Sequence, residues 1–156
     1  MTLEEFKSAR SVLSGVLNDT RLVYSSAFSK ATNNHVYLKP ENMQVTGAYK
    51  IRGAYYKIST LTDEQKQRGL ITASAGNHAQ GVAYAAQAAH VPATICMPST
   101  TPLVKVNNTK DYGAEVILQG ATFDDAADLA MQLAEERGLT YIPPFNDLTV
   151  ATGQGT

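Results

Sequence analysis

The sequence is poor in cysteine, has no tryptophan and carries almost no net charge. Cys96 is the only cysteine among 156 residues, which excludes a disulfide framework and a cysteine-based metal site. It lies in the apolar run 93–97, which predicts a buried strand and an inert core thiol. Thirteen basic residues are matched by fourteen acidic ones, and a formal net charge of −1 gives no indication of a nucleic-acid or membrane-surface partner.

Long apolar runs are also missing. No run is long enough to span a bilayer, and residues 1–10 are polar, without the apolar block of a signal peptide. We therefore expect a cytoplasmic protein. The apolar fraction of 44% and the charged fraction of 17% are those of ordinary globular proteins, and the length suits one sizeable domain better than two.

The second half of the sequence alternates short apolar segments with helical patterns. This alternation is typical of an α/β fold, and it predicts an open parallel four-stranded sheet flanked by helices. Thr122 is the expected cap of the last long helix and Gly138 is its expected end. The expected strands are 69–73, 92–97, 114–118 and 139–142, and the expected helices are 78–89, 102–112 and 123–137.

The first 45 residues are less regular, and the last six are unusual. The patterns predict a helix over 3–17, an extended segment at 22–24, a short helix or loop over 25–34 and a strand at 36–39. Residues 151–156 form a glycine-rich sequence that predicts a turn immediately before the end of the chain. We therefore expect a boundary drawn through a larger protein.

One stretch places a lysine among small residues. Thr46 is the expected cap of a helix that carries Lys50 and runs to about residue 59. Glycine costs a helix about 1 kcal/mol relative to alanine, so glycines here need a reason. The arrangement predicts clear space beside Lys50 for a flat, rigid group, although a solvated surface lysine is the commoner situation. The positions three before, three after and four after Lys50 are Gly47, Gly53 and Ala54.

A second glycine-containing loop, residues 74–81, joins an expected strand to an expected helix. In parallel sheets, ligands bind beyond the carboxyl ends of the strands, and the free N–H groups of a helix start attract anions. The loop has neither the dinucleotide-binding glycine spacing nor that of a P-loop, so a carboxylate is as suitable a guest as a phosphate. A loop that only turns the chain remains the alternative, and His78 is more often a polar helix-start residue than a catalyst.

Together, the two motifs resemble those of the fold-type II pyridoxal-phosphate enzymes, and within them the serine/threonine dehydratases. Residues 41–54 (Glu-Asn-Met-Gln-Val-Thr-Gly-Ala-Tyr-Lys-Ile-Arg-Gly-Ala) resemble the motif with the cofactor lysine. Residues 74–81 (Ser-Ala-Gly-Asn-His-Ala-Gln-Gly) resemble the substrate-carboxylate loop, and residues 151–156 resemble the turn that ends the small domain. The resemblance covers nearly the whole chain.

The resemblance implies a role for each motif residue. Lys50 would bind pyridoxal 5'-phosphate covalently and then act as the base that removes the Cα proton of the substrate. Tyr49 would pack beside the cofactor ring, and Asn77 would hydrogen-bond the ring oxygen. The substrate carboxylate would be held by Ser74, Ala75, Gly76, Asn77 and His78.

The implied reaction is the elimination of water from L-threonine, and from L-serine, to give 2-oxobutanoate or pyruvate and ammonia. With threonine as the substrate, this reaction opens isoleucine synthesis. The resemblance also implies that the full-length enzyme is a homo-oligomer. Ile51 stands where cysteine and threonine synthases tend to have aspartate, which favours a dehydratase. Ala75 stands where serine racemases have a second serine for acid–base work, so a racemase is the weaker alternative, beside a serine dehydratase.

The resemblance also implies a division of the chain. Residues 1–50 would belong to the large cofactor domain, residues 51–150 would form the small α/β domain, and residues 151–156 would begin the return to the large domain. The family's phosphate-binding glycine loop lies further along the chain, so we expect this polypeptide alone neither to hold the cofactor tightly nor to turn over threonine. The alternative from another class is a non-catalytic fragment that self-associates through exposed apolar surface.

Overall fold

The centre of the molecule is a parallel four-stranded sheet. The computed structural model describes all residues from 1 to 156, and the strands are hydrogen-bonded in the order β5-β4-β3-β6. The buried strand β3 lies between β4 and β6, with Leu70 aligned with Ala93 on one side and with Thr140 on the other. The predicted parallel α/β sheet is confirmed. Its strands are β3 (Leu70–Ala73), β4 (Ala93–Met97), β5 (Glu115–Leu118) and β6 (Thr140–Tyr141).

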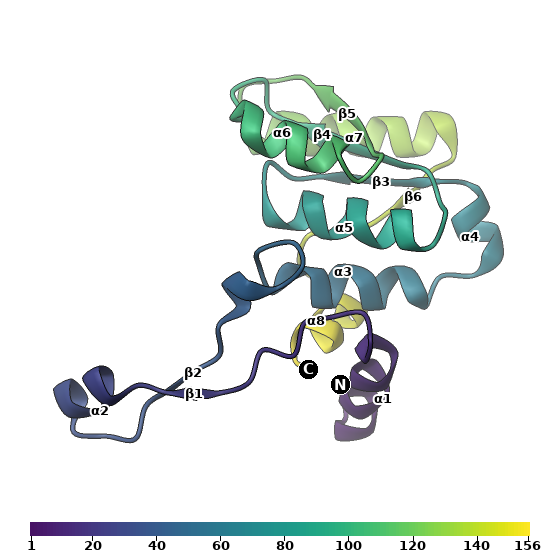
Figure 1. Ribbon diagram of the computed structural model, residues 1–156. Coiled ribbons are helices and arrows are strands. Elements are labelled where there is room, and N and C mark those ends of the chain that lie inside the picture. Colours follow the sequence, from purple (N-terminus) through teal and green to yellow (C-terminus); the bar gives the residue numbers. More distant parts are fainter.

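Helices cover both faces of this sheet (Figure 1). Helix α7 lies on one face and α5 on the other, with α3 packed against the outer side of α5. The Thr122 hydroxyl accepts from the Asp125 N–H and Gly138 ends α7, so the predicted cap and stop are confirmed. The helices of this unit are α3 (Lys50–Ser59), α4 (Asp63–Gln67), α5 (Asn77–Ala88), α6 (Leu103–Lys110) and α7 (Phe123–Arg137).

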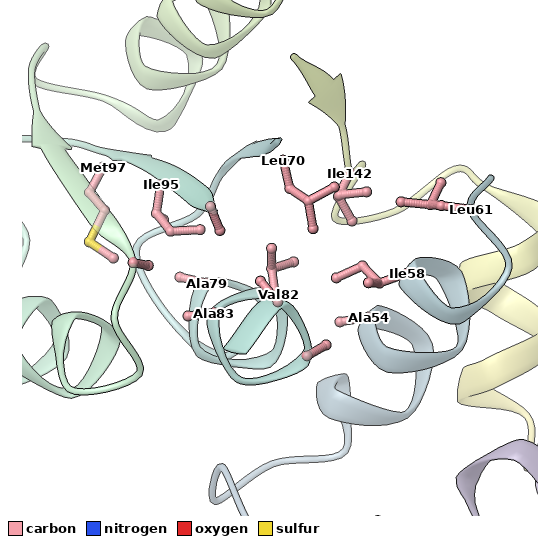
Figure 2. Close-up of a cluster of buried hydrophobic side chains, with 14 of the residues drawn as sticks. Ala54, Ile58, Leu61, Leu70, Ala79, Val82, Ala83, Ile95, Met97 and Ile142 are labelled. Carbon is pink, nitrogen blue, oxygen red and sulfur yellow. The ribbon is translucent and has the colours of Figure 1, made fainter. Parts of the chain in front are cut away.

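The apolar core is divided between the two faces. Figure 2 shows the larger cluster, in which Val82 of α5 lies between the sheet residue Leu70 and Ala54 and Ile58 of α3. The smaller cluster lies between the sheet and α7, and it includes Cys96. Burial raises the pKa of the Cys96 thiol to about 11, which makes it a poor nucleophile at neutral pH, as the sequence predicted.

The N-terminal part includes an arm that extends away from this body (Figure 1). The arm consists of β1 (Val23–Tyr24), α2 (Ser26–Thr32) and β2 (Tyr37–Leu38), with the two strands paired antiparallel. It is preceded by α1 (Leu3–Leu13) and followed by the 3₁₀-helix η1 (Glu41–Met43). Six large apolar side chains of the arm are exposed, namely Leu22, Val23, Tyr24, Phe28, Tyr37 and Leu38.

A buried ion pair attaches the segment after the arm to α3. Arg52 is 9% exposed and donates through Nε and Nη2 to the Glu41 carboxylate, both at 2.9 Å. Burial raises the pKa of Glu41, but hydrogen bonds from Arg52 and Thr20, with the charge of Arg52, outweigh it and lower the pKa to about 2. The pair thus joins the N-terminal segment to the helix that begins at Lys50.

The last residues form a helix instead of the predicted turn. Helix α8 (Leu148–Gln154) is capped by Asp147, which accepts from the Val150 N–H at 2.8 Å. It packs against α3 and α1, so the glycines near the end of the chain are part of a helix–helix contact. No helix of the protein combines the length and the apolar character needed to cross a membrane.

Candidate active site

Lys50 is the first residue of α3, where the sequence had predicted a position further inside a helix. The predicted cap is wrong: Tyr49 is the N-cap and makes no side-chain cap bond, while the buried Thr46 hydroxyl has no hydrogen-bond partner. Gly47, with φ of +71°, makes a turn before the helix. The half-buried Lys50 donates from Nζ to the Pro144 carbonyl at 3.0 Å. The amine is therefore held at the point where the chain leaves the sheet.

The space beside Lys50 lies on a different side from the one predicted. A Cβ on Gly53 would lie 2.6 Å from Gln154 Nε2, and Ala54 is fully buried in the core, so neither position leaves room for a ligand. A cavity of about 660 Å³ opens instead towards the segment between β6 and the end of α8. Its lining residues are Tyr49, Lys50, Pro144, Phe145, Asn146, Asp147, Leu148, Val150, Ala151, Gln154 and Gly155.

The predicted carboxylate loop connects the end of β3 to the start of α5. Gly76 is the N-cap and no side chain caps the helix, so the first-turn N–H groups have no partner within it. Ser74 Oγ accepts from the Gly76 N–H at 3.3 Å, and the Asn77 side chain is exposed. These free donors and the helix dipole favour an anion at this end of α5.

A lysine that the sequence did not single out stands beside this loop. Lys105 comes from α6, and its Nζ lies 3.8 Å from where a Cβ on Gly76 would be. The exposed amine forms no ion pair within the chain, so its charge adds to the attraction for an anion. Gly76 and Lys105 are 29 positions apart in the sequence, which explains why no local pattern marked this lysine.

His78 points into the interior, away from the loop. Its side chain is 2% exposed, its Nε2 lies 3.3 Å from the Ile142 carbonyl and its Nδ1 has no partner. Burial lowers the pKa of His78 to about 4, although the hydrogen bond with Ile142 raises it, and the nearby charge of Lys50 lowers it further. The imidazole is neutral at pH 7, and only the backbone N–H of His78 lies at the uncapped N-terminal end of α5.

The predicted site residues are thus brought together in two groups. Tyr49 and Lys50 share the large cavity, whereas residues 74–78 do not line it. The segment 142–144 connects the groups, because it bonds His78 through one carbonyl and Lys50 through another. Sequence reasoning missed Gln154 and the apolar wall of Phe145 and Leu148, since all three come from the end of the chain.

The lysine at a cavity and the uncapped start of α5 are the two features that the sequence associated with pyridoxal-phosphate enzymes, and the family comparison agrees. The family model described as pyridoxal-phosphate dependent enzyme matches residues 13–156. The chain therefore belongs to the pyridoxal-phosphate dependent enzyme family, whose members use this cofactor.

Within this family, the chain is similar to several named enzymes. The chain is 51% identical over 156 residues to an L-threonine ammonia-lyase of Thermotoga maritima, and 46% identical over 157 residues to a catabolic L-threonine dehydratase of Staphylococcus aureus. All of this chain aligns with each relative, but it spans only 39% and 45% of their lengths. The solved structure of maize serine racemase is 33% identical, with a TM-score of 0.92 over 98% of this chain and 46% of that one.

The residues present fit one end of the cofactor better than the other. The cavity supplies a primary amine on Lys50 for the aldehyde, and Tyr49, Phe145 and Leu148 give it an apolar wall suited to a flat ring. No cation other than Lys50 lines the cavity, and the carboxylate of Asp147 is paired with Lys57 at 2.7 Å. The cavity therefore fits the aldehyde and the ring, and offers no charged partner for the phosphate.

Proposed function

We propose that this chain supplies the lysine and the carboxylate-binding loop of an ammonia-lyase acting on L-threonine, and on L-serine. The products are 2-oxobutanoate or pyruvate, and ammonia. The observation that carries the proposal is that segment 142–144 connects the Lys50 amine at its cavity with the uncapped start of α5, through bonds to Lys50 and to His78. The names of the Thermotoga and Staphylococcus relatives support threonine as the substrate.

Each residue has a separate task in this proposal. The N–H groups at the start of α5, with Ser74 and the charge of Lys105, hold the substrate carboxylate and so orient the Cα–H bond. Lys50 Nζ is the base that takes the proton from Cα. Pyridoxal phosphate would be held by Lys50 until the substrate amine replaces the lysine amine, which is then free to act as the base, and it would supply the electron sink for the negative charge left on Cα. Tyr49 would pack beside the cofactor ring, and Asn77 would donate to its oxygen.

A chimera tests this assignment directly. The 156 residues replace the matched segment of the Thermotoga maritima enzyme, and the release of 2-oxobutanoate from L-threonine is measured. We expect the chimera to turn over threonine and the Lys50→Ala variant to lose this activity. The control variant Lys30→Ala removes an exposed lysine from the arm and should keep the activity. A folded chimera that binds the cofactor and leaves threonine unchanged would refute the proposal.

The separate 156-residue chain is proposed to be inactive, because its cavity lacks a partner for the phosphate. We expect that borohydride does not trap a pyridoxyl group selectively on Lys50 at micromolar cofactor concentrations, and that threonine is not consumed. Selective trapping together with 2-oxobutanoate release from the chain alone would contradict this.

The exposed apolar side chains of the arm support the domain division that the family resemblance implies. Residues 1–50 are proposed to belong to a large domain, 51–150 to the small domain and 151–156 to the return between them, within a homo-oligomeric enzyme. The six exposed apolar residues of the arm support this, since a surface of that kind is normally covered. The alternative hypothesis is a non-catalytic fragment that self-associates through this surface. That hypothesis predicts a dimer whose amount rises with protein concentration and which Phe28→Ser disrupts, and light scattering measures both effects.

Two finer assignments, dehydratase rather than racemase and a role in isoleucine synthesis, are tested by the reaction products and by growth. Ala75 carries no group for acid–base work on the second face of Cα, so we expect the chimera to form no D-serine; D-serine formation would favour the racemase alternative. We propose that the reaction takes place in the cytoplasm and opens isoleucine synthesis. Growth of a dehydratase-deficient strain without isoleucine, restored by the chimera, is the expected result, and failure despite activity in extracts would contradict that role.

A further inference from the structure

The helix that carries Lys50 begins without a local cap. Its N-cap residue Tyr49 makes no side-chain bond to the first turn, and the Thr46 hydroxyl is buried without a partner. Within the first turn, the Arg52 N–H is satisfied by the Tyr49 carbonyl at 3.0 Å. The Gly53 N–H is a remaining donor of this turn, and it needs an acceptor from elsewhere in the molecule.

That acceptor is the side chain of Gln154, from α8. The Gly53 N–H donates to Gln154 Oε1 at 3.2 Å, across 101 positions of sequence. The other end of the same amide, Nε2, donates to the Lys50 carbonyl at 3.5 Å. Gln154 therefore contacts the backbone of α3 on both sides of its first turn, including Lys50 itself.

The close approach of the two helices makes these contacts possible. A Cβ on Gly53 would lie 2.6 Å from Gln154 Nε2 and 2.7 Å from the Val150 carbonyl, and a Cβ on Gly153 would lie 2.7 Å from the Arg52 carbonyl. Larger side chains at positions 53 and 153 would hold α8 away from α3, so Gly53, which the sequence associated with ligand space, serves this crossing instead.

The start of α8 is fixed independently. Asp147 caps α8 by accepting from the Val150 N–H at 2.8 Å, and its other oxygen pairs with Lys57 of α3 at 2.7 Å. Because one end of α8 is tied to the last turn of α3 and the other to its first turn, Gln154 has a defined position. It also lines the cavity that Lys50 faces.

We propose that Gln154 is a positioning residue for Lys50: it caps the first turn of α3 from α8 and thereby sets the direction and reactivity of the lysine amine. It does not touch the reacting atoms. The inference rests on the proposed function of Lys50 as the cofactor lysine. In this role Gln154 acts on the backbone of α3 and contacts neither the substrate nor the cofactor.

Two measurements on the 156-residue chain test it. The first is amide hydrogen exchange at Gly53, which reads the cap directly; loss of a helix cap corresponds to about fivefold faster exchange. The second is competitive labelling by pyridoxal phosphate and borohydride, read by mass spectrometry as the labelling rate of Lys50 relative to the exposed Lys30 of α2. Neither measurement requires turnover.

The variants remove or keep the acceptor. Gln154→Leu, and Gln154→Met as a longer alternative in case the first fails to fold, are expected to speed exchange at Gly53 about fivefold and to change the Lys50-to-Lys30 ratio at least threefold. Gln154→Glu keeps an oxygen for the Gly53 N–H and is expected to restore slow exchange. Gln132→Leu, on the exposed face of α7, is the matched control and is expected to change neither reading.

The outcomes that overturn the inference are distinct from failure of the proposed function. A labelling ratio within twofold of the unmodified chain in both apolar variants overturns it, even when Gly53 exchanges faster, because Gln154 is then a cap with no effect on Lys50. Unchanged exchange at Gly53 overturns it as well. Failure of the proposed function is read separately, as a folded chimera that binds the cofactor and leaves threonine unchanged, whatever Gln154 does.

Discussion

Acidification from pH 7 to pH 5 is expected to destabilise the protein through one buried imidazole. The pKa of His78 is lowered from 6.5 to about 4, so the folded state resists a proton that the unfolded state accepts. The stability that this difference contributes is complete above pH 6.5 and is lost as the pH falls towards 4. One pKa unit corresponds to about 1.4 kcal/mol, so the free energy of unfolding should fall by about 2 kcal/mol between pH 7 and pH 5.

Urea unfolding at a series of pH values measures this slope, and the pH range avoids most carboxylate titration. His78→Gln keeps a donor for the Ile142 carbonyl and does not titrate, so its free energy of unfolding should change by less than about 0.5 kcal/mol over the range. His35→Gln, at an exposed position, should keep the full slope. A flat profile in the unmodified chain, or an unchanged slope in His78→Gln, would refute a buried neutral imidazole.

Three further changes test the contacts around α3 and the loop. Gly53→Ala should destabilise the chain by about 1 to 2 kcal/mol in urea unfolding, because the clash with the Val150 carbonyl exceeds the gain in helix propensity; higher stability would contradict the close crossing. Arg52→Met should cost at least about 3 kcal/mol by leaving the largely buried Glu41 carboxylate without its charged partner, and adding Glu41→Leu should recover most of the loss; a cost below about 1 kcal/mol would disprove the pairing. In the chimera, Lys105→Met should raise KM for threonine about fivefold and leave kcat within twofold, and the effect on KM should shrink at high salt. The control Lys110→Met should change neither constant. Equal effects of the two variants would show that Lys105 is not part of the carboxylate site.

The sheet and its long helices were predictable because their signals are local. The strands from Leu70 to Tyr141 are short apolar runs separated by helical patterns, and a parallel order follows from the alternation. Thr122 was a sound cap prediction because the Asp125 side chain, three positions later, returns a bond to its backbone N–H. Such pairs are encoded within one turn of the chain.

Thr46 failed as a cap for the opposite reason. The chain turns at Gly47 and α3 begins only at Lys50, so the hydroxyl is buried away from the first turn. The acceptor that the helix uses is Gln154, which no window of sequence around Lys50 contains. The tail was misjudged in the same way, because its glycines suggest a turn until α3 is placed against them.

The sequence by itself determined the chemical parts: a lysine flanked by small residues, a glycine loop between a strand and a helix, and the strands that bring that loop to one edge of the sheet. Only the tertiary structure decided where the free space lies and what holds the lysine. Gly53 is bare because α8 crosses there, and the cavity beside Lys50 is formed with residues 144–155, about a hundred positions along the chain. Contacts over that distance depend on which helices pack together, and a local periodic pattern shows which face is buried without showing which segment covers it.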